Sequence, residues 1–127
     1  MSYTIKNLGD VEDAAVKGGF SEYQEARFAR TAFEAQETGL TLIRVRPGKR
    51  QAFGHRHESA EEVYVVLSGS GRVRLDEATV ELKPLDALRV APQVARRFEA
   101  GDDGLQVLAV GAHHPKDGEV LPDFWAE

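Results

Sequence analysis

Residues 55–64 read HRHESAEEVY and place two histidines and a glutamate between two segments of strand length. In a β-strand, residues two apart point to the same face, about 6.5 to 7 Å along the chain, so His55 and His57 project together while Arg56 faces away. A short turn over 58–61 lets the chain return antiparallel, and Glu62 then leads the next strand. The spacing therefore predicts that both imidazoles and one carboxylate reach a single point inside a sheet.

Glycine and proline divide the chain on both sides of this stretch into short segments. From Gly39 onward, each segment carries apolar residues at alternate positions or in brief runs, and connectors such as Pro47-Gly48 have turn chemistry. The predicted strands are 40–46, 52–57, 62–67, 72–75, 79–82, 87–91, 96–100 and 105–110. Such short strands without long helical stretches between them favour an all-β barrel or jelly roll over a parallel α/β arrangement.

Three regions follow from this pattern: an N-terminal extension over 1–38, a barrel over 39–112 and a tail over 113–127. In the extension, Ser21 with Gln24 could cap a short helix, whereas 26–33 fits an edge strand equally well, and either could contact a second copy of the chain. The tail has loop composition until Phe124 and Trp125. We expect these aromatics to pack on the barrel or on a partner.

Composition excludes several classes of protein. The 127 residues, 42% hydrophobic and 29% charged, suit one globular domain. A net charge of −5 without a basic block argues against nucleic-acid binding. The absence of cysteine rules out disulfides, thiolate metal sites and a cysteine nucleophile. No apolar signal core and no run of 18 apolar residues occur, so we expect a cytoplasmic protein without membrane attachment.

The block that begins at the two histidines resembles the first motif of the cupin superfamily, G-x5-H-x-H-x3,4-E-x6-G. His55, His57, Glu62 and Gly69 match it in spacing, whereas Gly48 lies one residue too early for the opening glycine. The resemblance, closest to the small single-domain bacterial members, covers roughly residues 39 to 111. It implies a double-stranded β-helix, or jelly-roll barrel, with a divalent ion of iron, manganese, nickel or zinc on His55, His57 and Glu62.

The second cupin motif, G-x5-P-x-G-x2-H-x3-N, implies a third histidine ligand, but this chain departs from it. Its five motif positions are occupied by Leu85, Ala91, Gln93, Arg96 and Ala100. A guanidinium stays protonated and offers only donors, so Arg96 cannot bind a cation. Turned inward, it would repel a metal and pair with Glu62, leaving a metal-free pocket. Turned away, it would leave a three-ligand metal site, and the sequence keeps both alternatives open.

Further candidate site residues follow from strand parity. Tyr64 lies two residues beyond Glu62 and faces the same interior, either as a core aromatic or as a catalytic acid or base. Phe53 and Phe98 share parity with His55 and Arg96, so we expect Phe53, Phe98 and Arg96 to line a partly apolar substrate pocket. His113 and His114 are either a polar loop or a replacement ligand over the barrel mouth.

Two principal hypotheses for function follow. The first is a divalent-metal-dependent enzyme of the dioxygenase, isomerase or lyase type that acts on a small polar metabolite. The second is a non-catalytic module that binds an anionic small molecule, the metal having been lost because Arg96 replaces the third histidine. A weaker third is a metal-independent isomerase with a histidine base and a tyrosine acid. Because cupin-like barrels commonly pair, the resemblance also implies a homodimer.

Overall fold

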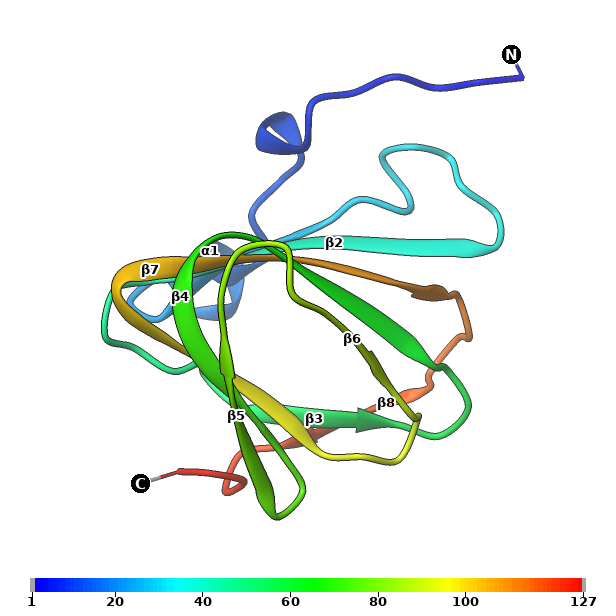
Figure 1. The fold of residues 1–127 in the computed structure, drawn as a ribbon. Helices are drawn as coiled ribbons and strands as arrows, with labels where there is room; N and C mark the ends of the chain where they lie inside the picture. The colour runs from blue at the N-terminus through cyan, green and yellow to red at the C-terminus, as the bar shows by residue number, and fades with distance from the viewer. Residues whose placement is uncertain (1, 127) are drawn as a thin grey trace.

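Strands dominate the chain, as the alternating pattern predicts (Figure 1). The computed structural model describes residues 2–126. Its elements are η1 (Leu8–Asp10), α1 (Ala14–Gly18), β1 (Gln24–Phe28), β2 (Thr38–Val45), β3 (Gly54–His57), β4 (Glu62–Leu75), β5 (Ala78–Leu82), β6 (Ala87–Val90), β7 (Arg96–Ala112) and β8 (Gly118–Leu121). None of the helices in the described part of the chain is long and apolar enough to cross a membrane.

The strands form one antiparallel sheet that curls upon itself, as Figure 1 shows. The order is β1-β2-β7-β3-β8, and β4 pairs with β5, β6 and β7. The long strands β4 and β7 join the two halves, because the start of β4 pairs with the end of β7 and its end with the start of β7. The predicted all-β barrel is confirmed.

The lengths of β4 and β7 differ from the sequence prediction. Segments 62–67 and 72–75 are two halves of β4, and 96–100 and 105–110 are two halves of β7, so the turns predicted between them were wrong. The register of β4 against β7 shifts between Val66 and Ser68 and again between Gly69 and Gly71. A β-bulge and a turn both favour glycine because both need a backbone conformation that other residues rarely adopt. The two therefore look alike in sequence.

In the N-terminal extension, the helix predicted after Ser21 is wrong, because Gln24 begins the edge strand β1, which ends at Phe28; the short helix lies earlier in the chain. Helix α1 begins after Asp13, whose carboxylate accepts the Ala15 N–H at 3.0 Å and the Ala26 N–H at 2.9 Å. This one side chain therefore caps the helix and ties it to β1, which pairs with β2 at the sheet edge. In the tail, where composition predicted loop, β8 pairs with β3. A homodimer contact through the extension stays a prediction.

The core lies between the curled halves of the sheet. Its largest fully buried apolar side chains are Tyr64, Phe98, Val66, Val73 and Val107. The rings of Tyr64 and Phe98 pack with centroids 4.9 Å apart. Burying a side chain of this kind contributes roughly 1.5 to 3 kcal/mol, so these residues supply much of the barrel's stability.

Glu99 organises an ionic cluster on the barrel surface. Its carboxylate accepts hydrogen bonds from the Nε atoms of Arg50 and Arg72, both at 2.7 Å. The Arg50 guanidinium lies 4.0 Å from the centre of the Trp125 ring, and its Nη1 donates to the Trp125 carbonyl at 2.7 Å. Burial raises the pKa of Glu99, but the bonds from Arg72 and Arg50 outweigh it, so the pKa lies below its ordinary value.

Replacing Glu99 with glutamine is expected to destabilise the fold in a pH-dependent way. Because the folded pKa is lower than the unfolded value of about 4.3, the ionised group stabilises the protein fully above that pH and loses its effect as pH falls through the folded pKa. The difference in urea midpoint between wild type and Glu99→Gln should therefore narrow from pH 7 to pH 3. Glu77→Gln, at a fully exposed side chain, is the control. A difference independent of pH would contradict this assignment.

Candidate functional site

His55, His57 and Glu62 converge at one point on the inner face of the barrel. The Nε2 atom of His55 lies 3.3 Å from Glu62 Oε1, and the Nε2 atom of His57 lies 3.2 Å from the same oxygen. The two imidazole rings stand nearly perpendicular, with centroids 5.1 Å apart. One ligand atom from each of the three residues lies within 4.8 Å of the others, so this set could hold a metal ion.

Local structure explains the convergence. Strand β3 alternates, so Arg56 points away from the two histidines and donates to Glu119 of β8 at 3.0 Å. The turn that follows is shaped by Asp117, whose carboxylate accepts the N–H groups of Ser59 at 2.8 Å and Ala60 at 2.9 Å. The chain then reverses into β4 with Glu62 as its first residue. Strand alternation and one side-chain-bound turn together aim the three groups inward.

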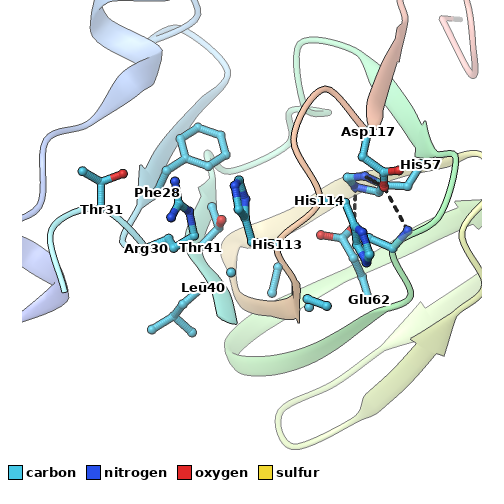
Figure 2. A pocket seen from close by; sticks show the side chains of 15 residues that line it. Phe28, Arg30, Thr31, Leu40, Thr41, His57, Glu62, His113, His114 and Asp117 are labelled. Carbon is cyan, nitrogen blue, oxygen red and sulfur yellow. Dashed lines mark hydrogen bonds and ion pairs between the residues drawn. The ribbon is translucent and has the colours of Figure 1, made fainter. Parts of the chain in front are cut away.

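Asp117 is a site residue that the sequence analysis missed. Its Oδ2 atom lies 3.2 Å from Nδ1 of His57 (Figure 2). Burial raises the pKa of Asp117, but the hydrogen bonds from the N–H groups of Ala60 and Ser59 lower it by more. The pKa of Asp117 is therefore below its ordinary value. A carboxylate at the second nitrogen of a metal-binding histidine fixes the ring and its tautomer. No short-range spacing could have revealed this residue, because it lies in a tail of loop composition.

Arg96 turns inward, which is the orientation expected to weaken binding of a metal ion. The side chain is fully buried on β7, in register with His55 of β3. Its Nη1 donates to the carbonyls of Pro92 at 3.1 Å and Val94 at 2.7 Å, while Nη2 lies 3.4 Å from Glu62 Oε1. Within residues 2–126, Nε and Nη2 have no hydrogen-bond partner. A fixed positive charge therefore stands where the resemblance to the second motif implied a third histidine.

Tyr64 holds the glutamate from the other side. Its hydroxyl donates to Glu62 Oε1 at 2.5 Å, and its side chain is almost wholly buried. Burial, followed by the charge of Glu62, raises the pKa of Tyr64 far above its usual range. The phenol therefore stays protonated and acts as a donor that positions Glu62.

Glu62 itself is ionised despite its burial. Burial raises the pKa of this carboxyl group, but the close approach of the two imidazoles, the hydrogen bond from Tyr64 and the attraction of His55 outweigh it. The net pKa lies well below the usual range for a glutamate. The site therefore contains one anionic oxygen ligand beside two imidazole nitrogens.

A cavity of about 350 Å³ adjoins the site. Its wall includes His55, His57, Glu62 and Tyr64, together with apolar groups such as Phe28 and Phe53. Of the three residues expected to line a substrate pocket, Phe53 lies on this wall, whereas Arg96 and Phe98 are absent from it. Phe98 is buried against the Tyr64 ring. Arg96 approaches Glu62 but does not line the cavity.

A second cavity of about 320 Å³ meets the same site from the open end of the barrel. Figure 2 shows Arg30, Phe28 and His113 on one side of it and His57, Glu62 and Asp117 on the other. His114 also lines this cavity. The two consecutive histidines were weighed as a replacement ligand, whereas Arg30, which lies just beyond β1, was not predicted as a site residue.

The fold and the converging ligands define a small β-barrel protein with a candidate metal centre. The family model described as the cupin domain matches residues 41–111, so this chain belongs to the cupin-domain family. An uncharacterized protein of Methanocaldococcus jannaschii is 30% identical over 70 residues, which are 53% of this chain and 56% of that protein. This chain therefore spans about half the length of the curated relative that it matches.

Solved structures share the fold at low sequence identity. The polyketide cyclase RemF from Streptomyces resistomycificus superposes with a TM-score of 0.75 at 22% identity, over 91% of this chain and 83% of the cyclase. A cupin protein from Bacteroides fragilis gives 0.71 at 20% identity, over 91% and 88%. Oxalate decarboxylase of Bacillus subtilis, studied for its Mn(II) centres, gives 0.75 at 21%, over 90% of this chain and 31% of that one.

Proposed function

We propose that this protein binds a divalent first-row metal ion through His55, His57 and Glu62 and acts as a small-molecule enzyme. The observation that carries the proposal is the His57 Nε2 atom. It is buried and has no hydrogen-bond partner in the described chain, yet it lies 3.2 Å from Glu62 Oε1. Two ligands bound at about 2.1 Å and roughly 100° apart are separated by about this distance, so the donor set fits a shared ion.

The surrounding residues suit such a centre. Asp117 Oδ2 lies 3.2 Å from Nδ1 of His57, and the Tyr64 hydroxyl donates to Glu62 Oε1. The cavity wall beside the site is partly apolar and includes Phe28 and Phe53. When bound, a divalent ion would polarise a substrate oxygen or activate water or dioxygen, which serves dioxygenase, isomerase and lyase chemistry alike. The substrate class that we propose is a small polar metabolite.

Metal content of protein purified without a histidine tag tests the proposal. After supplementation with Fe, Mn, Ni or Zn salts, elemental analysis should find close to one ion per chain in the wild type. His57→Ala should lower affinity at least 100-fold because one of three ligands is removed. Arg56→Ala is the matched control, since Arg56 sits between the histidines but faces outward and binds Glu119. Equal metal content in all three proteins would exclude this site.

A metal-free binding module is the second candidate, and Arg96 favours it. The guanidinium Nη2 lies 3.4 Å from the carboxylate oxygen that an ion would use. At about 4 Å and an effective dielectric near 20, each unit of like charge costs roughly 4 kcal/mol, which weakens metal binding. If wild-type protein stays free of metal after supplementation yet binds small organic anions, this second function is supported instead.

A further inference from the structure

We infer that the cavity at the open end of the barrel binds a small organic acid, with its carboxylate on Arg30 and its apolar part against Phe28. The inference names the ligand class of the proposed small-molecule site and rests on that function. The carboxylate contact itself does not require a metal ion. The two can therefore be tested separately.

Arg30 is a cation without a counter-ion in the described chain. It is half-buried where the chain leaves β1, and it lines the cavity with its neighbours Phe28 and Thr31. The one hydrogen bond of its guanidinium among residues 2–126 runs from Nη1 to the Ala35 carbonyl at 3.2 Å, and no ion pair involves it there. Two edges of the guanidinium therefore keep donors for a planar, bidentate acceptor such as a carboxylate.

The carboxylates that face this cavity are already compensated. Glu62 is surrounded by Arg96, Tyr64 and the two site histidines. Asp117 accepts the N–H groups of Ser59 and Ala60 and faces His57. Neither carboxylate pairs with Arg30. His113 and His114, which are not acidic, line the same wall. The open end of the cavity therefore favours an anion.

The remaining walls indicate the rest of the ligand. Phe28, Leu40, Ala60 and Ala109 provide apolar surface to this cavity. Phe28 and Ala109 also line the first cavity, the one beside Tyr64 and Phe53. Apolar surface therefore continues past the site from one cavity to the other. Among the residues that line the cavity proposed to bind the acid, Arg30 is the only arginine or lysine. A singly charged carboxylate with an apolar body fits this distribution better than a phosphate, which needs more donors.

Binding of benzoate, measured by NMR titration in the presence of a chelator, tests the inference. Wild-type protein should bind benzoate, and should bind the neutral benzamide and inorganic phosphate more weakly. Arg30→Gln should weaken benzoate binding about 10- to 100-fold, since a charge-assisted hydrogen-bond pair is lost. Arg30→Lys keeps the positive charge but loses the paired N–H donors of the guanidinium. Its affinity for benzoate should lie between those of the wild type and Arg30→Gln.

The matched control is Arg74→Gln, because Arg74 donates to the Asp76 carbonyl in its own hairpin and lines none of the cavities described above. It should bind benzoate like the wild type. Unchanged affinity in Arg30→Gln, preference for phosphate, or no benzoate binding by wild type would each overturn the inference. If Arg30→Gln unfolds, the comparison of Arg30→Lys with Arg74→Gln decides. Because the chelator removes metal throughout, failure of the metal proposal would not alter these results.

Discussion

Arg96→His is expected to tighten binding of a divalent metal ion by at least 100-fold. Position 96 lies opposite His55 in the β3–β7 pair, and its side chain reaches Glu62 Oε1. The substitution removes a fixed positive charge and adds an imidazole ligand to the two that are present. A like charge at about 4 Å costs roughly 4 kcal/mol per unit, and each 1.4 kcal/mol is tenfold in affinity, so 100-fold is the low end of the expected gain.

Competition with a chromophoric chelator measures this gain for Mn, Zn and Ni. Arg96→Gln is the matched control, because it removes the charge without supplying a ligand, and its affinity should fall between wild type and Arg96→His. Both variants lose the bonds from Arg96 to the carbonyls of Pro92 and Val94, so a loss of fold would affect both and would be seen in thermal unfolding. Equal affinities in three folded proteins would show that Arg96 does not limit metal binding.

Gly69→Ala is expected to destabilise the protein by about 3 to 5 kcal/mol, a large fraction of the stability of a small domain. Gly69 has φ of 85°, which L-residues with a side chain rarely adopt. An added Cβ would also overlap the carbonyl oxygen of Gly104 on β7. The β4–β7 pairing would have to separate at its bulge. This explains in physical terms why the matched cupin motif ends in glycine at this position.

Urea denaturation followed by circular dichroism measures the loss. Gly48→Ala is the control, because Gly48 has a comparable φ of 71° but nothing within 4 Å of an added Cβ. It should cost only about 1 to 2 kcal/mol, the penalty of the backbone conformation alone. If both variants lost the same stability, close strand approach at Gly69 would not be the cause of its requirement.

The alternation of His55, Arg56 and His57 was sufficient to predict which side chains face the interior. That property is local, because a strand of period 2 assigns each residue to one face whatever it pairs with. The spacing to Glu62 added only a short turn, and the structure brings the three groups together. The glycines between the halves of β4 and β7 were misassigned as turns, because bulge and turn require the same backbone freedom.

By itself, the chain's order of residues determined an all-β barrel and the inward-facing group of His55, His57 and Glu62. Tertiary structure alone decided that Arg96 points at Glu62, that Asp117 reaches His57 from the tail, and that Phe28 rather than Phe98 borders the cavity. The reason is physical. The face of a strand follows from neighbouring residues, whereas contacts across the barrel depend on the order and register of all the strands, which only the complete fold sets.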